Sequence, residues 1–266
     1  MTRVLILGKG IVGDATGYAL EHKGAEVWYH DPPKGIFATG PDELDIESVD
    51  LALICVGSPL GRDGRADTTQ VSDVIELLCY NGWRGPVGIR TTVPPGTCDA
   101  WQEALPSLTF FSWPEFLMAR EARQWALAPR YNVLGVRESA EPALRGLDGL
   151  LKTRFGTHLV KPIEAEFIKY ATNALLASSV GVANELAELA AALGIDWNKD
   201  LPEIAQHDLN LPRNIWVQDG GGFGGACLPK DLSALLHFAK THDQPLPVLT
   251  ALDAENRKRR AGRGDY

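Results

Sequence analysis

The apolar residues in the first half of the chain cluster in short runs that amphipathic stretches separate. Short apolar runs bounded by turn residues are typical of strands buried in a sheet. We expect strands over 4–7, 27–31, 51–56, 86–92, 108–112 and 131–135. Helical patterns lie between several of them, over about 14–23, 67–80 and 139–151. Strands that alternate with helices predict an α/β domain with a parallel sheet and crossover helices.

The pattern changes after about residue 162. Residues 164–193 form an alanine- and leucine-rich run without proline, which predicts a single helix roughly 45 Å long. Shorter helical patterns follow over 198–207, 231–242 and 247–260. We therefore expect two domains, a sheet domain over 1–162 and, over 163–266, a long linking helix with a small all-helical dimerisation domain. The long helix would expose an apolar face in a single chain, so we expect a homodimer.

Composition and charge narrow the classes of partner. The net charge of -8 and the pI near 5.3 argue against a nucleic-acid or anionic-membrane surface. No uninterrupted apolar run approaches the roughly 20 residues of a membrane span, and the chain starts directly with a strand pattern. The four cysteines lack metal-ligand spacing, so we expect no metal site. A cytoplasmic protein without a membrane or nucleic-acid partner fits these features.

Gly8, Gly10 and Gly13 form a G-x-G-x-x-G sequence between the first strand and the first helix. In this context the first glycine makes the turn, the second admits a pyrophosphate, and the third lets the helix approach the strand. We expect Ile11 and Val12, inside the motif, to contact the cofactor as well. The alternative is a purely structural turn. The motif predicts a Rossmann-like, dinucleotide-binding fold for residues 1–162.

Asp31 ends the second strand, about 20 residues after the glycines, where an acid binds the adenosine ribose. The carboxylate favours NAD over NADP. Lys34 lies nearby and is expected to be a further cofactor contact. Its positive charge keeps NADP, which carries a 2′-phosphate, open as an alternative.

Polar residues follow the third and fourth strands. Val56, Ser58 and Thr92 lie where those strands end, and ligands of parallel sheets bind outside the carboxyl ends of the strands. We expect these residues to face the nicotinamide side of the cofactor. Ordinary turn chemistry is the alternative, because serine, threonine and proline are common in turns.

A single cysteine, Cys227, lies between a glycine run that starts at Gly220 and the start of a helix. The positive end of the helix dipole favours its thiolate, and Pro229 suits the first helical turn. Asp231 follows four residues later, within reach of a group bonded to the sulfur. The alternative is a small packed thiol beside a glycine-rich turn.

Lys169 and Asn173 are four residues apart on the long helix and therefore share a face. A lysine and an asparagine aimed at a reacting oxygen could stabilise an oxyanion. A solvated helix face is the alternative.

Together these segments resemble the UDP-glucose/GDP-mannose dehydrogenase family of nucleotide-sugar 6-dehydrogenases. The segment 222–231, GFGGACLPKD, resembles the family's catalytic-cysteine motif GFGGxCxPKD. The other matches are 55–59 with 63–64 and 67–68 (CVPTP…DG…DTS), 91–97 (STVPPGT), 114–117 (PEFL), 166–173 (the long-helix AELIKYAxN) and 184–185 (NE). Their shared order over nearly the whole chain makes the match specific.

The resemblance implies oxidation of a C6 alcohol to a carboxylate with two NAD. Cys227 would form a thiohemiacetal and then a thioester, which water hydrolyses. Lys169 and Asn173 would hold the oxyanion, and Asp231 would assist proton transfer. Thr92 would hold a water or the substrate hydroxyl, and Glu115 would be a further acid or base. Substrate contacts are expected from Glu115, Phe116, Leu117, Lys169, Asn173, Arg213, Phe223 and Gly224.

Two departures from the family pattern keep other functions open. Ala119 stands where the family usually has a second glutamate, with Glu121 close by. Family members also carry another α/β domain beyond the helical region, so we expect weak turnover of UDP-glucose by this chain alone. A nucleotide sugar, a nucleotide or a sugar phosphate could be the substrate. A two-electron alcohol dehydrogenase and a non-catalytic NAD-binding subunit are the alternative functions.

Overall fold

The computed structural model describes residues 1–38, 46, 48–138, 144, 148–151, 156–207, 222–225 and 227–261. The chain divides into two compact units. The first contains Met1–Pro59 and Asp67–Lys169, and the second contains Leu60–Ala66 and Tyr170–Tyr266. The division falls inside the long helix, a few residues after the boundary expected at 162, and the domain limits expected from the sequence stay a prediction.

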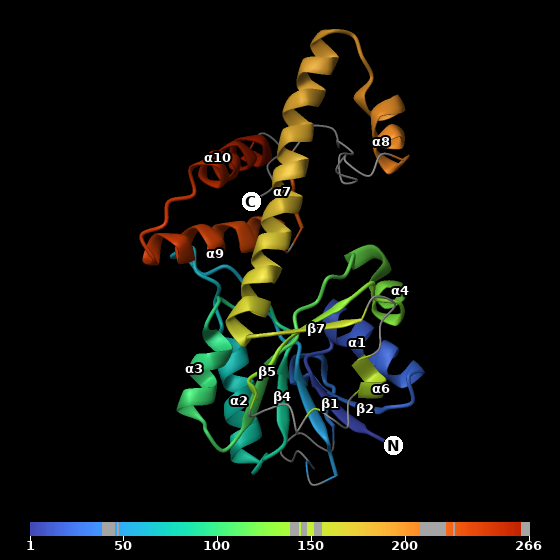
Figure 1. Ribbon diagram of the computed structural model, residues 1–266, viewed down its shortest axis with the longest axis vertical. Helices are drawn as coiled ribbons and strands as arrows, with labels where there is room; N and C mark the ends of the chain where they lie inside the picture. The colour runs from blue at the N-terminus through green and yellow to red at the C-terminus, as the bar shows by residue number, and fades with distance from the viewer. Residues whose placement is uncertain are drawn as a thin grey trace. The chain divides into compact units, whose positions relative to one another are not determined.

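A seven-stranded sheet forms the centre of the first unit (Figure 1). Its order is β2-β1-β3-β4-β5-β6-β7, which brings the ends of β1 and β3 side by side. The strands are β1 (Arg3–Leu7), β2 (Glu26–His30), β3 (Leu51–Ile54), β4 (Pro86–Ile89), β5 (Thr109–Ser112), β6 (Asn132–Gly135) and β7 (Thr157–Val160). Six of these strands lie where the apolar runs predict them.

The sheet is mostly parallel, as expected, with one antiparallel pair that the sequence did not predict. Strands β2 to β5 pair in parallel with their neighbours, but β5 and β6 are antiparallel, joined at Ser112 and Gly135. Strand β7 then pairs in parallel with β6. A run of apolar residues does not encode strand direction, because direction follows from which neighbour supplies the hydrogen bonds.

Helices cover both faces of this sheet. Alternate residues of β1 point to opposite faces: Leu5 and Leu7 join one core, and Val4 and Ile6 join the other. Helices α2 (Thr69–Tyr80) and α3 (Thr97–Ala104) cover the first face. Helices α1 (Ile11–His22), α4 (Ala122–Leu127) and α6 (Asp148–Leu151) lie toward the other face (Figure 1). Two short 3₁₀ turns cover Pro32–Lys34 and Ala119–Glu121.

Three short elements of the first unit have no clear pattern in the sequence. Helices α3 and α4 and strand β7 were not expected, since each is brief and only partly buried. Of the helix expected over 139–151, the structure describes Leu144, which is buried, and α6; Ser139 lies outside the described residues.

Helix α7 (Pro162–Ala192) confirms the long helix predicted from the alanine- and leucine-rich run. The second unit adds α8 (Trp197–His207), α9 (Leu228–Thr241) and α10 (Pro247–Ala261). Tyr170 and Ala174 of α7 pack against Leu235 of α9, and Ala177 packs against Leu232. Small alanines on α7 allow this close helix packing.

By length and composition alone, α7 could also cross a membrane. This corrects the expectation that no segment is apolar enough for a span. Ser178 and Ser179 interrupt the apolar runs, yet alanine, leucine and valine around them keep the mean hydropathy high. The test rests on composition, and only 28% of the apolar window is buried.

Candidate functional site

The three glycines of the fingerprint have three different environments in the first unit. Gly8 has φ +95°, and a side chain there would meet Val56 and Cys55 backbone atoms at about 3 Å. A Cβ on Gly13 would lie 1.9 Å from the Gly8 carbonyl oxygen, so only glycine permits this contact between β1 and α1. A Cβ on Gly10, by contrast, would meet no described atom within 4 Å apart from its chain neighbours and the backbone of its own helix. The turn therefore has no space for a side chain at its first and third glycines, whereas its second glycine borders open space.

Helix α1 begins directly after Gly10 without a side-chain cap. Its first backbone N–H groups are therefore available to an anion, and the helix dipole favours negative charge there. Ile11 is 59% exposed at this end. The open face of Gly10 and the uncapped helix fit the pyrophosphate of a dinucleotide, with Ile11 and Val12 beside it.

Asp31 lies directly after β2 and has its carboxylate beside the same turn. Its Oδ2 accepts a hydrogen bond from the Lys9 backbone N–H at 2.8 Å and lies 3.4 Å from Lys34 Nζ. Lys34 Nζ also donates to the Lys9 carbonyl oxygen. Both recorded contacts use Oδ2, which leaves Oδ1 facing no described donor. Asp31 is thus held in place with one oxygen available for a ribose hydroxyl.

Hydroxyl groups join the ends of β3 and β4. Ser58 Oγ donates to the Thr92 carbonyl oxygen at 2.7 Å, and Thr91 Oγ1 donates to the Val56 carbonyl oxygen at 2.8 Å. The Ser58 side chain therefore has a partner inside the protein, and its expected contact with a cofactor stays a prediction. Thr92 and Val56 are half-buried.

Glu115 and Lys169 form a buried ion pair in the first unit. Lys169 Nζ donates to Glu115 Oε1 at 2.9 Å, and both side chains are less than 10% exposed. Glu115 Oε2 accepts a further hydrogen bond from the Leu117 N–H at 2.6 Å. Lys169 Nζ also lies 5.5 Å from the centre of the Phe116 ring. Lys169 therefore does not lie on a solvated helix face, which was the alternative. Its cation is buried, and the ion pair with Glu115 compensates for its desolvation.

In the second unit, Cys227 is exposed and caps the N-terminus of α9. Pro229 lies in the first turn, as expected. Asp231 is buried one turn further, with its N–H bonded to the Cys227 carbonyl oxygen at 2.8 Å. Asn173 Nδ2 donates to Asp231 Oδ2 at 2.5 Å, and Lys230 Nζ lies 2.6 Å from Oδ1. The alternative of a packed thiol does not hold, because the sulfur-bearing residue is at the surface beside an ordered acid.

Phe223 and Gly224 belong to the loop before Cys227. Phe223 is 4% exposed, and its ring joins the core of the second unit. Asn256 fixes its backbone: Phe223 N–H donates to Asn256 Oδ1 at 2.7 Å, and Asn256 Nδ2 donates to the Phe223 carbonyl oxygen at 3.1 Å. The ring of Phe223 is buried and its backbone is hydrogen-bonded to Asn256, so its expected contact with a substrate stays a prediction. Gly224 has open space around it. Arg213 lies outside the described residues.

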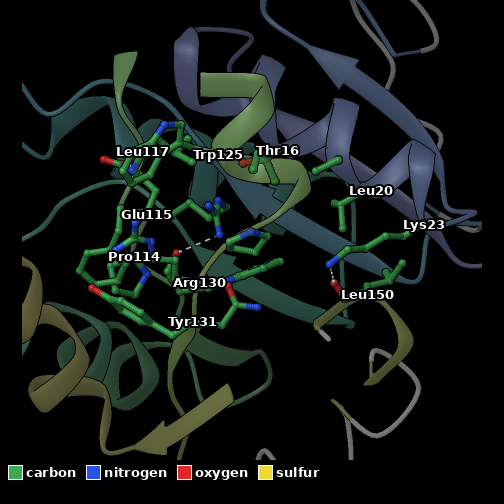
Figure 2. Close-up of a pocket in the computed structure, with 17 residues that line it drawn as sticks. Thr16, Leu20, Lys23, Pro114, Glu115, Leu117, Trp125, Arg130, Tyr131 and Leu150 are labelled. Carbon is green, nitrogen blue, oxygen red and sulfur yellow. Dashed lines mark hydrogen bonds between the residues drawn. The ribbon is translucent and has the colours of Figure 1, made fainter. Parts of the chain in front are cut away.

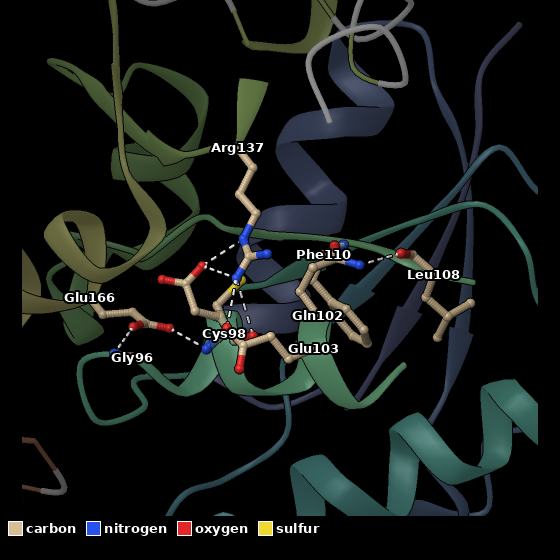
Figure 3. A network of polar contacts seen from close by, with 9 residues as sticks. Gly96, Cys98, Gln102, Glu103, Leu108, Phe110, Arg137 and Glu166 are labelled. Carbon is tan, nitrogen blue, oxygen red and sulfur yellow. Dashed lines mark hydrogen bonds and ion pairs between the residues drawn. The ribbon is translucent and has the colours of Figure 1, made fainter. Parts of the chain in front are cut away.

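One buried residue, Glu166 of α7, has a role that the sequence analysis missed (Figure 3). Its carboxylate accepts hydrogen bonds from the backbone N–H groups of Gly96, at 2.6 Å, and Cys98, at 2.8 Å. Gly96 caps α3 with φ +92°, so Glu166 holds the end of the segment that carries Thr92. Burial raises the pKa of Glu166 to about 7. In the sequence, the position of Glu166 in the E-F-I-K segment of α7 was the feature that could have indicated this role.

Cys55 and Cys98, two other thiols of the first unit, are buried. Burial raises the pKa of Cys55 to about 12 and also raises the pKa of Cys98. Their thiolates are therefore strongly disfavoured. Cys55 is a packed thiol of the core.

The comparisons with known proteins agree with this arrangement. Residues 163–258 match the central domain of the UDP-glucose/GDP-mannose dehydrogenase family. A UDP-glucose 6-dehydrogenase from Rickettsia typhi is 32% identical over 222 residues, which cover 81% of this chain and 51% of that protein. A GDP-mannose 6-dehydrogenase from Pseudomonas putida is 30% identical over 228 residues, 79% of this chain and 51% of that protein.

A solved structure extends the likeness to the fold. The UDP-glucose dehydrogenase of the archaeon Pyrobaculum islandicum superposes with a TM-score of 0.79 at 27% identity. The match covers 97% of this chain and 68% of that one. The chain spans about half the length of the curated relatives it matches.

Proposed function

Because the chain belongs to the UDP-glucose/GDP-mannose dehydrogenase family, we propose that it oxidises a primary alcohol of a nucleotide sugar to a carboxylate with NAD. A related nucleotide or sugar phosphate is included in the proposed substrate class. The observation that carries the proposal is Cys227, exposed at the start of α9 with buried Asp231 one turn away. A surface thiol at a helix N-terminus beside an ordered acid suits covalent chemistry.

The fingerprint residues would hold the cofactor. The open side of Gly10 and the uncapped start of α1 suit its pyrophosphate, and Asp31 suits the adenosine ribose. Bound NAD would supply the hydride acceptor for each oxidation. The negative charge of Asp31 disfavours a ribose 2′-phosphate, which supports NAD over NADP.

Cys227 would act after the first oxidation. The alcohol loses a hydride and a proton and becomes an aldehyde. The Cys227 thiolate adds to the aldehyde carbon, and the thiohemiacetal loses a second hydride and its hydroxyl proton to give a thioester. Water then breaks the carbon–sulfur bond and returns the thiolate. The overall change consumes one alcohol, two NAD⁺ and one water, and yields one carboxylate, two NADH and three protons.

In this proposal, side chains of both units would move and hold the protons. Asp231, fixed by Asn173 and Lys230 in the first turn of α9, would exchange a proton with water. Asn173 and Lys169 would donate hydrogen bonds to the developing oxyanion. Glu115, whose Oε1 lies 2.9 Å from Lys169 Nζ, would be a further acid or base, and Thr92 would hold a water or the substrate hydroxyl.

The test is the number of NADH formed per substrate, measured with the 266-residue chain and a panel of UDP-glucose, GDP-mannose, nucleotides and sugar phosphates. We expect two NADH per molecule of one panel member, with a carboxylate as product. One NADH per substrate would mean a two-electron alcohol dehydrogenase and would contradict the thioester. NAD binding without reduction by any panel member would contradict enzymatic activity on this substrate class.

A further inference from the structure

A cavity of about 210 Å³ lies in the first unit (Figure 2). Thr16 and Leu20 of α1, together with Lys23 directly after that helix, line one side of it. The segment from Pro114 to Leu117, after β5, lines another side. Among its described lining residues are none of the fingerprint glycines, nor Asp31, Thr92 or Lys169. Glu115, Phe116 and Leu117, which are expected to contact the substrate, form part of its wall, but the proposed oxidation assigns no role to Thr16, Lys23 or Arg90.

Two buried donors that line this cavity lack a hydrogen-bond acceptor. Thr16 is 3% exposed and Arg90 is 6% exposed. Neither Thr16 Oγ1 nor Arg90 Nε has a hydrogen-bond partner among the described residues. Arg90 Nη1 reaches the Trp113 carbonyl oxygen only at 3.4 Å. A buried donor without an acceptor is costly, more so when it is charged, and guanidinium keeps its charge in proteins. An acceptor inside the cavity would satisfy both groups.

The charges around the cavity favour an anion. Lys23, Arg90 and Arg130 line it, and Glu115 is the one carboxylate among its described lining residues. Glu115 already has Lys169 and the Leu117 N–H as partners. Its charge is therefore paired with Lys169. No salt bridge of the described part of the chain joins a carboxylate to the Arg90 guanidinium, on which Glu115 acts only at longer range. One carboxylate bound beside Arg90 would complete the charge pairing.

The walls favour a flat, apolar body attached to that carboxylate. Trp113, Phe116, Trp125 and Tyr131 supply four aromatic rings, and Leu20 and Leu150 add aliphatic surface. The Arg90 guanidinium already stacks on the Trp113 ring, 4.3 Å from its centre. A cavity of about 150 Å³ is large enough to bind benzene. The present volume therefore fits one ring with one carboxylate, but not a nucleotide sugar.

We infer that this cavity is a binding site for a small aromatic monocarboxylate, with its carboxylate between Arg90 and Thr16 and its ring against the tryptophans. Because the wall includes the Glu115–Leu117 segment, such a ligand would touch the residues beside the Lys169 ion pair. The inference does not depend on the proposed oxidation, since it concerns binding alone.

The test is calorimetric titration of the full chain with benzoate, benzyl alcohol and acetate. We expect one saturable benzoate site. Benzyl alcohol keeps the ring and loses the charge, while acetate keeps the charge and loses the ring, so each should bind at least about tenfold more weakly. Equal affinity for benzoate and benzyl alcohol, or no saturable benzoate binding up to about 10 mM, would overturn the inference. Acetate that binds as tightly as benzoate would overturn the aromatic class.

Variants locate the site. Arg90→Met should weaken benzoate binding about tenfold or more, and Thr16→Val about threefold. Arg84→Met is the matched control, because Arg84 is exposed and does not line the cavity. The affinity of this variant for benzoate should equal that of the unmodified chain. If Arg90→Met does not fold, as judged by circular dichroism, Thr16→Val and the three ligands decide the result. Unchanged affinity in a folded Arg90→Met or in Thr16→Val contradicts the assigned position.

Discussion

Among single residues, Asp31 is held inside the protein through one of its two carboxylate oxygens. Oδ2 is fixed by the Lys9 N–H and by Lys34, and Oδ1 has no described donor. We predict that the protein binds NAD more tightly than NADP and that Asp31→Ala improves NADP binding about tenfold, since the repulsion of a 2′-phosphate is lost. Dissociation constants measured by fluorescence titration check this. Asp73→Ala, an exposed acid on α2, should change neither constant; equal affinity of the unmodified chain for both cofactors contradicts the prediction.

Cys227 is the residue on which the proposed covalent step depends. We predict that Cys227→Ser binds NAD normally but forms carboxylate on the order of 10²-fold more slowly, because serine is a far weaker nucleophile at neutral pH. Product analysis and NADH counts with the substrate found in the panel measure this. Cys79→Ser is the control, since Cys79 is a half-buried thiol on α2. Carboxylate formation by Cys227→Ser at the unmodified rate rules out the thioester.

At the scale of elements, α3 is fixed to α7 by a single carboxylate. Glu166 accepts hydrogen bonds from Gly96 and Cys98 at the positive end of α3, and Arg137 pairs with Asp99 in its first turn, at 2.7 Å (Figure 3). Without this anchor, the end of the segment that carries Thr92 would lose its connection to α7. Glu166 is thus a positioning residue for that segment.

The raised pKa of Glu166 gives this anchor a pH dependence. The pKa of Glu166 is about 7 in the folded chain and 4.5 as a free side chain. Between pH 4.5 and 7, the side chain is therefore more often protonated in the folded state than in the unfolded state. The free energy of unfolding therefore falls as pH rises from about 4.5 to 7, by up to about 3 kcal/mol from this group.

Urea unfolding at a series of pH values measures this slope. We predict that Glu166→Gln removes the part of the slope due to this group, because glutamine does not titrate. Glu164→Gln, an exposed glutamate on the same helix, is the matched control and should keep the slope. The same pH slope in Glu166→Gln and in the unmodified chain would show that Glu166 does not titrate in this range.

At the scale of the whole molecule, α7 carries an apolar stripe that the described part of the chain leaves exposed. Leu175, Val182, Leu186 and Leu189 are between 47% and 71% exposed. Their spacing of seven, four and three residues places them within an arc of about 60° on the helix. Such a stripe suits a second copy of the same helix in a two-fold dimer, as in coiled coils.

We predict a dimer at micromolar concentration and a shift to monomer in Leu186→Asp, since the charge would be buried in the interface. Sedimentation velocity measures both. Ala191→Asp is the control, because Ala191 is exposed and lies about 160° around the helix from Leu175. This variant should remain a dimer. A monomer in the unmodified chain, or its flotation with lipid vesicles as a monomer, would contradict the dimer and point to another partner for the stripe.

The sequence by itself determined the local features. The spacing of Gly8, Gly10 and Gly13 predicted a turn that the structure confirms, because a side chain at the first or third position would overlap the backbone. The alanine- and leucine-rich run likewise determined α7, and Pro229 predicted the start of α9. Helix starts, tight turns and amphipathic periods depend on residues a few positions apart, and those residues are visible in one sequence.

Only the tertiary structure decided features that join distant residues. The antiparallel pairing of β6, the anchoring of α3 by Glu166 and the hydrogen bonds of Asn256 to the Phe223 backbone involve partners 23 to 70 positions apart. The missing acceptor for Arg90 also depends on what surrounds it in space. Hydrogen-bond partners and burial are properties of the packed chain, so apolar patterns alone give no strand direction and no count of unsatisfied donors.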